Sequence, residues 1–307
     1  MASKSSCVFD LTLPMDHERL LEALEILSER YSFLRIHELC ESILGKSIPV
    51  LTVGDGKRSV LYVGAHHGME WMTSMLLLQF IHELCDGAYH EKRMWERSVP
   101  ILLEQFSVHV IPMLNPDGVD YQIHGITEEN PLYQRVISMN SGSPDFSKWQ
   151  ANARGVDLNH NYDAGFREYK RLEAEEQIPC GAPTRYSGQE PESEPEVHGL
   201  CEYIRFQKDL RLVLSLHTQG EVIFCGGHAI NGTEAAISKL AQLTGYRVAM
   251  PEGLAAYGGL TDWCVEKQGI PALTLECGKG SNPLPLPAFF PIYTGLREAL
   301  FVAPTLF

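Results

Sequence analysis

The stretch VLYVGAHHGMEW, residues 60–71, decides the fold of this 307-residue chain. Residues 60–65 are a short aliphatic run, which predicts a strand buried on both faces. His67 and Glu70 follow directly, and the apolar residues 71–84 then predict a helix. This order is typical of α/β proteins, and it places both polar side chains at the carboxyl end of a strand, where open α/β sheets bind ligands.

Segments of strand and helix character alternate along the rest of the chain. Short aliphatic runs at residues 106–112, 210–216 and 271–275 predict three more buried strands. A capping-box pattern at residues 193–196 predicts the start of one helix, and residues 233–244 predict another. The alternation indicates an α/β fold, and a chain of this length can bury one large core as a single domain.

One segment does not follow this alternation. Residues 164–192 are rich in charge, lack an apolar period and have Gly and Pro at their far end. This composition predicts a long surface excursion, and such loops often border a functional site.

Composition excludes several classes of partner. The formal net charge of −14 disfavours nucleic acid and anionic membrane surfaces as partners. Binding to them depends mainly on attraction to negative charge, and a negatively charged protein is repelled instead. The longest apolar stretch is far shorter than the roughly 20 residues of a membrane span, and the first ten residues contain no apolar run of signal-peptide length. Eight scattered cysteines without CxxC pairs suit reduced thiols. We therefore expect a cytoplasmic protein without nucleic-acid or membrane partners, and the oligomeric state stays open.

A third side chain can join His67 and Glu70. His217 ends the predicted strand at residues 210–216 and can converge on the same sheet edge. Two imidazoles and one carboxylate leave a fourth position for water, which is typical of catalytic zinc. The HxxE pair alone is a weak signal, because a His and a Glu three residues apart often mean only a solvated helix face.

Five motifs in order strengthen this interpretation. They are His67-Gly68-Met69-Glu70-Trp71, Asn115-Pro116-Asp117-Gly118, Gly155-Val156-Asp157-Leu158-Asn159, Ser215-Leu216-His217 and Thr274-Leu275-Glu276. With these motifs the chain resembles the zinc carboxypeptidase (metallocarboxypeptidase) family over about residues 48–282.

A narrower resemblance rests on further motifs. They are Trp149-Gln150-Ala151-Asn152, His217-Thr218-Gln219-Gly220-Glu221, Gly258-Gly259-Leu260-Thr261-Asp262-Trp263 and Gly278-Lys279-Gly280-Ser281-Asn282-Pro283-Leu284-Pro285. Within the family they are most similar to the γ-D-glutamyl-meso-diaminopimelate peptidase-like branch.

The family resemblance implies a fold. It is a carboxypeptidase-like, three-layer α/β/α arrangement around a central mixed, largely parallel twisted sheet. We expect residues 1–307 to form one zinc peptidase domain, with residues 1–47 as an N-terminal helical lead-in packed on it.

The resemblance also implies the metal site. One zinc ion per chain is bound by His67, Glu70 and His217. Glu276 is then the general base, which takes a proton from the attacking water and passes it to the leaving amine. Asp157 orients His67 through its free ring nitrogen. The alternatives are that Glu276 caps a neighbouring helix and that Asp157 is a turn residue.

The sequence departs from the family where substrate is bound. Carboxypeptidases follow the asparagine equivalent to Asn159 with an arginine, and the pair clamps the substrate's terminal carboxylate, whereas this chain has His160. Histidine lacks the bidentate guanidinium fork, so His160 is either a weaker carboxylate contact or a wall of the pocket. The family arginine that steadies the oxyanion aligns near Gln150. Gln150, Asn152 or Arg154 can supply a donor instead, and the sequence does not choose among them.

Two further positions concern the substrate side chain. The family tyrosine that closes over substrate aligns with Leu254. Tyr257, one helical turn later, can take its place; the alternative is that Tyr257 is an ordinary loop aromatic residue. Thr261 matches the position that faces the leaving-group side and makes no demand for an aromatic, aliphatic or basic side chain. Diaminopimelate carries an ammonium and a carboxylate, and a polar pocket is compatible with it. The residues that can supply contacts are Gln219, Glu221, Thr261 or Lys279.

Three functions follow from these residues. The first is a zinc metallopeptidase that hydrolyses an amide in short peptides, γ-D-glutamyl-diaminopimelate bonds of muropeptides above all. The second is a zinc deacylase or deglutamylase acting on N-acyl or glutamyl substrates. The third is a non-catalytic peptide-binding relative, which the missing arginines suggest and the retained metal ligands and Glu276 disfavour.

Overall fold

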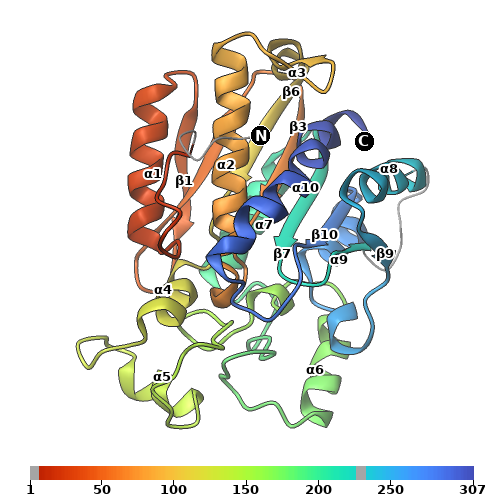
Figure 1. Cartoon of the computed structure of the whole chain (residues 1–307). Coiled ribbons are helices and arrows are strands. Elements are labelled where there is room, and N and C mark those ends of the chain that lie inside the picture. Colours follow the sequence, from red (N-terminus) through yellow and green to blue (C-terminus); the bar gives the residue numbers. More distant parts are fainter. Residues whose placement is uncertain (1–6, 226–232) are drawn as a thin grey trace.

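One mixed sheet forms the centre of the computed structural model, which describes residues 7–225 and 233–307 (Figure 1). In spatial order its strands are β1 (Arg35–Glu41), β2 (Ser47–Val53), β6 (Phe106–Ile111), β3 (Arg58–Val63), β7 (Leu210–His217), β10 (Ala272–Glu276), β8 (Val222–Cys225) and β9 (Arg247–Ala249). The central strands β6, β3, β7 and β10 are parallel, and antiparallel β2 and β8 flank them. The predicted mixed, largely parallel sheet is confirmed.

Helices cover both faces of this sheet (Figure 1). The α-helices are α1 (His17–Arg30), α2 (Met72–Tyr89), α3 (Val99–Gln105), α4 (Pro116–His124), α5 (Tyr133–Met139), α6 (Phe166–Glu175), α7 (Pro195–Phe206), α8 (Glu234–Thr244), α9 (Leu260–Trp263) and α10 (Phe289–Val302). Shorter elements are the hairpin β4 (Arg93–Met94) and β5 (Arg97–Ser98), and the single turns η2 (Gly68–Glu70), η3 (Leu158–His160), η4 (Gly253–Ala256), η5 (Cys264–Gln268), η6 (Leu286–Ala288) and η7 (Ala303–Thr305).

Alternate residues of the central strands build two separate cores. On β3, Val60 and Tyr62 pack with residues of α1, α2, α8 and α10, whereas Leu61 and Val63 pack with residues of α7 and α9. Successive side chains of a strand point to opposite faces, so a continuous apolar run serves both layers. The predicted three-layer α/β/α fold is confirmed.

The strands place the site at one end of the molecule. In Figure 1 the carboxyl end of β7 points toward the region that contains α4, α5 and α6. Connections after the central strands therefore gather at this edge of the sheet. Long segments between residues 112 and 195 form much of the chain around this edge of the sheet, where open α/β sheets bind ligands.

Two sequence predictions about helices need correction. Residues 164–192, predicted as a long surface excursion without an apolar period, contain the helix α6, on which Phe166 and Tyr169 are buried. The capping box at residues 193–196 is wrong, because α7 starts at Pro195 and the side chain of its N-cap, Glu194, makes no capping hydrogen bond. A buried contact with Asn152 holds the Glu194 carboxylate instead.

The N-terminal lead-in is only partly helical. Between residues 7 and 47 it contains α1, but it also contains β1, which pairs with β2 at the edge of the sheet. Residues 1–6 lie outside the described residues. They belong to the predicted lead-in and to the first ten residues, in which the sequence shows no signal-peptide run. The assignment of one domain to the whole chain stays a prediction.

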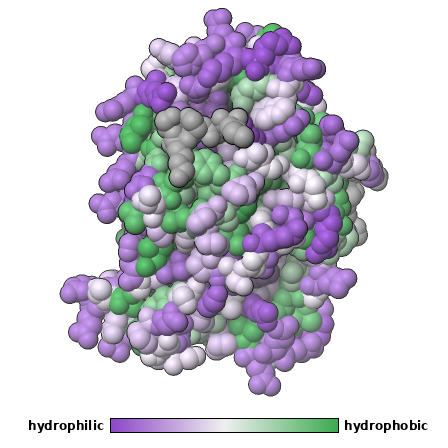
Figure 2. Space-filling model, in the orientation of Figure 1, coloured by the Kyte–Doolittle hydropathy of each residue, from purple (hydrophilic) through white to green (hydrophobic). Residues whose placement is uncertain are grey.

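The surface view complements this description. Hydrophilic residues cover the upper end of the face seen in Figure 2, and hydrophobic residues gather nearer its middle. Within residues 7–225 and 233–307, no helix combines the length and the apolar character that crossing a membrane requires.

Three buried carboxyl groups meet beneath the loop of residues 150–157. We call Asp117, Glu194 and Glu196 the acidic node, since each is at most 3% exposed. The Asn152 amide donates to Oε2 of Glu194 (2.7 Å) and to Oε2 of Glu196 (3.4 Å). Burial raises the pKa of Glu196 to about 8, and the neighbouring carboxylates of Glu194 and Asp117 add to this increase. Glu196 is thus the member of the node that keeps its proton near neutral pH.

Replacing Glu196 tests this assignment. Its carboxyl pKa is raised from 4.5 to about 8 on folding, so stability is complete below the lower value and is lost as the pH rises through the upper one. Glu196→Gln keeps a neutral donor at every pH. We therefore expect the variant to match wild type at about pH 4 and to be more stable at about pH 9, by up to several kcal/mol at ~1.4 kcal/mol per pKa unit. Urea unfolding across this range measures the difference.

The control lies on the same helix. The Glu202 side chain is 45% exposed and pairs with Arg205, so Glu202→Gln is expected to follow wild type at every pH. Parallel stability curves for wild type and Glu196→Gln would contradict the assignment of the bound proton to Glu196.

Candidate metal centre and active site

The turn after β3 presents His67 and Glu70 at the edge of the sheet. Ala65 adopts a φ of +46°, which starts the reversal of the chain. Thr73 secures the turn, because its hydroxyl accepts from the Ala65 N–H (2.7 Å) and donates to the Glu70 carbonyl (2.8 Å). His67 directly precedes η2, which ends at Glu70. Both side chains thereby project from one short, closed turn.

Gly68 allows this turn to pack directly on α4. Its N–H donates to the Gln150 carbonyl (2.9 Å). A Cβ atom at this position would lie 2.2 Å from the carbonyl oxygen of Gly118, which is backbone and cannot swing aside. The turn that carries His67 and Glu70 and the Asn115-Pro116-Asp117-Gly118 motif therefore fit together only with glycine at position 68.

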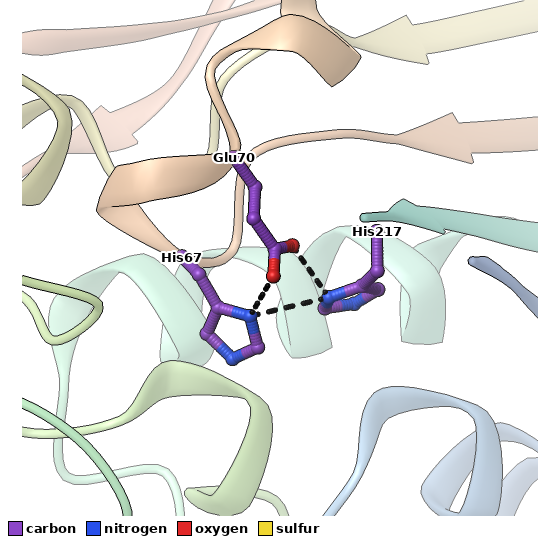
Figure 3. Close-up of side chains that lie close together, drawn as sticks. All are labelled: His67, Glu70 and His217. Carbon is purple, nitrogen blue, oxygen red and sulfur yellow. Dashed lines mark hydrogen bonds and ion pairs between the residues drawn. The ribbon is translucent and has the colours of Figure 1, made fainter. Parts of the chain in front are cut away.

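Three side chains converge at this edge, as Figure 3 shows. Nδ1 of His67 lies 3.0 Å from Oε1 of Glu70, and Nδ1 of His217, at the end of β7, lies 3.0 Å from Oε2. The two Nδ1 atoms are 3.3 Å apart. The prediction that these three residues meet is confirmed as geometry.

This donor set fits a divalent metal. Two imidazole nitrogens and a carboxylate are the ligands of many catalytic zinc sites, and with Zn–N distances of about 2.0–2.1 Å two ligands of a tetrahedral ion lie about 3.3 Å apart. The observed separations of 3.0–3.3 Å are close to that value. The three residues could hold one metal ion, with a position left for water.

The outer nitrogen of each imidazole also has a partner. Nε2 of His67 lies 3.0 Å from Oδ1 of Asp157, and Nε2 of His217 lies 3.1 Å from Oγ of Ser215. Asp157 itself accepts the Arg185 N–H (2.9 Å) on its other oxygen. These contacts leave both Nδ1 atoms to face the centre of the cluster, an arrangement that fixes the tautomer of a metal-bound histidine.

The electrostatics of the cluster favour a cation. Burial raises the pKa of Glu70, but His67 and His217 outweigh it and hold the value at about 2. Burial lowers the pKa of His67, but the Glu70 and Asp157 carboxylates outweigh it and hold the value well above its usual range. Two buried carboxylates thus stabilise positive charge between them, either as protons on the imidazoles or as a metal ion that displaces them.

Glu276 lies beside this cluster. It ends β10 and is the register partner of His217 on the parallel neighbour β7. Burial raises the pKa of Glu276 to about 7; His217 opposes this increase and Glu70 adds to it. A carboxylate with a pKa near neutral is suited to accept and return a proton in the same reaction.

The three oxyanion candidates have different surroundings. Asn152 is fully buried, donates to the acidic node and accepts the N–H groups of Arg154 and Val156, so its side chain is committed to the loop. The Arg154 guanidinium pairs with Glu194 at 3.2 Å and is 40% exposed. The Gln150 side chain accepts from the Thr184 hydroxyl. This geometry disfavours Asn152 and leaves Gln150 and Arg154.

His160 occupies the place of the missing arginine. Its Nδ1–H donates to the Tyr257 carbonyl (3.0 Å), and its ring stacks on Tyr169 at 4.4 Å. Burial lowers the pKa of His160, so the ring is neutral near pH 7 and Nε2 is an acceptor. An acceptor does not bind a carboxylate, so of the two alternatives for His160 the structure favours the pocket wall.

The remaining substrate candidates take structural contacts. Asn159 accepts the Leu260 N–H at the start of α9 (3.4 Å). Tyr257 packs its ring against Gly165, where a Cβ atom would lie 2.6 Å from the ring. Thr261 is buried, with its hydroxyl 3.4 Å from that of Thr274 on β10. Their roles toward substrate stay predictions.

Lys279 and Glu221 pair with each other at 2.5 Å. Lys279 is 74% exposed on its side chain, so this pair lies at the surface of the protein. Two of the residues expected to line a polar substrate pocket, Lys279 and Glu221, thus form an ion pair with each other.

Comparison with known proteins settles the family. The family model described as zinc carboxypeptidase matches residues 20–298. The chain belongs to the zinc carboxypeptidase family. It is therefore a metallopeptidase-type hydrolase, and the resemblance inferred from the five motifs is confirmed.

Individual relatives are similar over most of the chain. γ-D-glutamyl-L-diamino acid endopeptidase 1 of Lysinibacillus sphaericus is 29% identical over 287 residues, which cover 93% of this chain and 70% of that protein. Among solved structures, carboxypeptidase A from Helicoverpa armigera has a TM-score of 0.70 at 18% identity and covers 97% of this chain and 74% of its own. Murein-tripeptide amidase from Escherichia coli O157 has a TM-score of 0.51 at 20% identity and covers 88% and 91%. At these identities the two structures show the carboxypeptidase-type fold.

Sequence reasoning missed two residues that contact the candidate metal centre. Ser215 contacts His217 from two positions earlier on the same strand, so the period of two in β7 could have predicted it. Asn282 lies 3.5 Å from Oε1 of Glu70. It belongs to a motif used for the resemblance, but a loop 212 residues away in sequence carries no local signal for this contact.

Removing one imidazole tests the metal centre. Wild-type protein is expected to retain one zinc ion per chain after dialysis. His217→Ala is expected to bind zinc more weakly. Loss of an outer-shell partner typically weakens metal binding by ~10–100-fold, and loss of a ligand should weaken it by more. Added zinc should raise the melting temperature of wild type, because a ligand that binds only the folded state stabilises it. Elemental analysis and thermal unfolding measure both effects.

The matched control is His124→Ala. His124 is exposed and pairs with Asp16, so this variant should keep the wild-type zinc content. Equal zinc retention by His217→Ala and wild type would rule out His217 as a ligand.

Proposed function

We propose that this chain is a zinc peptidase that cleaves an amide bond in short peptides, specifically the bond between a γ-D-glutamyl residue and a diamino acid in muropeptides. The observation that carries the proposal is the meeting of His67, Glu70 and His217 beside Glu276 at one edge of the sheet. One zinc ion per chain is the proposed cofactor, with His67, Glu70 and His217 as its ligands.

The metal supplies Lewis-acid chemistry when bound, which lowers the pKa of a water molecule and polarises the substrate carbonyl. The protein supplies orientation and proton transfer. Asp157 holds His67 by its outer nitrogen, and Ser215 does the same for His217. Both imidazoles then present Nδ1 toward the same point.

Glu276 moves the proton. Its carboxylate takes a proton from the attacking water as the new carbon–oxygen bond forms at the substrate carbonyl. The same carboxyl group then gives that proton to the nitrogen as the carbon–nitrogen bond breaks, so that an acid and an amine leave the site. A pKa of about 7 suits both halves of this exchange. Gln150 or Arg154 supplies the donor for the oxyanion.

The substrate assignment rests on similarity and on His160. The relative from Lysinibacillus sphaericus is named for cleavage of γ-D-glutamyl-L-diamino acid bonds. In this chain a neutral, stacked His160 stands where carboxypeptidases have the arginine that clamps a terminal carboxylate. A bond other than the last α-peptide bond of a protein chain is compatible with that loss.

A cytoplasmic location is part of the proposal. All eight cysteines are free thiols, and five of them are buried: Cys85, Cys201, Cys225, Cys264 and Cys277. Reduced thiols are the usual state of cysteine in that compartment. A cytoplasmic enzyme would act on muropeptide fragments recovered from the wall.

Glu276→Gln tests the proposed base. The substitution keeps the size of the side chain and removes its capacity to accept a proton. We expect zinc content to equal that of wild type and kcat to fall by ~10²–10⁴-fold, the usual contribution of general acid–base catalysis. Glu202→Gln, at a partly exposed position of α7, is the control. Retention of kcat by Glu276→Gln would refute the assignment.

A substrate panel tests the proposed specificity. Zinc-loaded protein is incubated with γ-D-glutamyl-diaminopimelyl peptides, ordinary α-peptides, N-acyl amino acids and glutamate-tailed peptides, and products are mapped by mass spectrometry. Cleavage of the first class with the highest kcat/KM is expected. Preference for acyl or glutamate-tailed substrates would favour the deacylase or deglutamylase, and binding without cleavage of any class would favour a non-catalytic relative.

A further inference from the structure

Glu70 differs from the two histidines in the way that its position is set. Asp157 and Ser215 hold the outer nitrogens of His67 and His217. The Glu70 carboxylate, in contrast, must present Oε1 toward one imidazole and Oε2 toward the other. A ligating carboxylate can rotate about its last side-chain bond, and ligating carboxylates are usually hydrogen-bonded by a donor from outside the cluster.

Asn282 supplies such a donor. Its Nδ2 lies 3.5 Å from Oε1 of Glu70, a long hydrogen bond, but one made to an ionised and nearly inaccessible acceptor. The same nitrogen lies 2.7 Å from the Thr218 carbonyl. A side-chain amide carries two N–H groups, so both contacts can be made together.

Thr218 determines which way round the amide lies. Its hydroxyl donates to Oδ1 of Asn282 (2.8 Å), while its carbonyl accepts from Nδ2. A carbonyl and a carboxylate can only accept, so both must face the amide nitrogen and not its oxygen. Two hydrogen bonds to one residue thus orient the amide, with its remaining N–H group directed at Glu70.

Asn282 is also fixed through its backbone. The ammonium group of Lys148 donates to its carbonyl oxygen. Three segments distant in sequence therefore meet at this residue: the loop after β7 through Thr218, the stretch before Trp149 through Lys148, and the chain that follows β10. This anchoring makes the position of Nδ2 a property of the fold.

We propose that Asn282 is a positioning residue, which holds the Glu70 carboxylate in the orientation that binds the metal, and that Thr218 orients Asn282 for this task. The inference deepens the proposed function and rests on it. In this role Asn282 acts through its contact with Glu70. Each of the three metal-binding side chains then has one dedicated partner: Asp157, Ser215 or Asn282.

The experiment measures the zinc dissociation constant by competition with a chromophoric chelator. Asn282→Ala is expected to weaken zinc binding by ~10–100-fold, the usual effect of removing an outer-shell partner. Thr218→Val removes only the hydroxyl that orients the amide and is expected to weaken binding less. Thr218→Ser keeps that hydroxyl and is expected to bind zinc with wild-type affinity.

A second asparagine separates positioning from general stability. Asn130 donates to the Tyr121 hydroxyl (3.1 Å) and accepts the Leu132 N–H (2.9 Å), which are contacts of similar number in another part of the chain. Asn130→Ala is expected to lower the melting temperature without changing zinc affinity. An equal loss of zinc affinity in Asn130→Ala and Asn282→Ala would overturn the inference, because stability alone would then explain it.

The outcomes also distinguish this inference from the proposed function. If wild type binds zinc and Asn282→Ala binds it equally tightly, the positioning role is wrong and the zinc hydrolase remains. If wild type does not bind zinc, the proposed function fails and the positioning role fails with it. If Asn282→Ala does not fold, the Thr218 pair decides: equal affinities of Thr218→Val and Thr218→Ser would overturn the inference.

Discussion

The burial of negative charge at the end of β3 is the constraint on which the rest of the site depends. Glu70 is 3% exposed and Asp157 is 2% exposed, and an ionised carboxylate in such surroundings is unstable unless cations and hydrogen bonds compensate it. Two imidazoles do so directly, and a divalent metal ion between them would do so more completely. The closed turn after β3 and the paired strands β7 and β10 make the compensating groups available at fixed positions.

Much of the fold could be predicted because its central strands are continuous apolar runs. The stretches around residues 60, 106, 210 and 271 are strands buried on both faces. A short, continuous apolar run fits such a strand better than it fits a helix. The failures occurred where tertiary contacts override local pattern. Glu194 satisfies a buried amide instead of capping its helix, and Tyr169 buries one side of a helix whose other residues are mostly charged. The contact of Glu194 has no signature within a few residues of sequence, whereas the spacing of Phe166 and Tyr169 is a short helical pattern among charged residues.

The candidate site divides in the same way. The meeting of His67, Glu70 and His217 could be expected because strand ends in parallel sheets lie at one edge, whereas the role of Glu276 was inferred from the resemblance to the family and stays a prediction. The substrate contacts were not, because their roles depend on side-chain direction within loops. The Asn152 side chain points into the acidic node, and one ring nitrogen of His160 donates to a backbone carbonyl. These groups are therefore not free to bind substrate, which the sequence alone does not reveal. The loops that distinguish one member of the family from another are where prediction from a single chain ends.

The register of His217 against Glu276 has an evolutionary consequence. Adjacent strands lie about 4.8 Å apart whatever connects them, so the spacing between one proposed ligand and the proposed base is set by backbone pairing within the sheet. Insertions or deletions in the connections at that edge leave this spacing unchanged. Descendants of such a scaffold can therefore diverge widely in the peptides they accept while they inherit the same reaction.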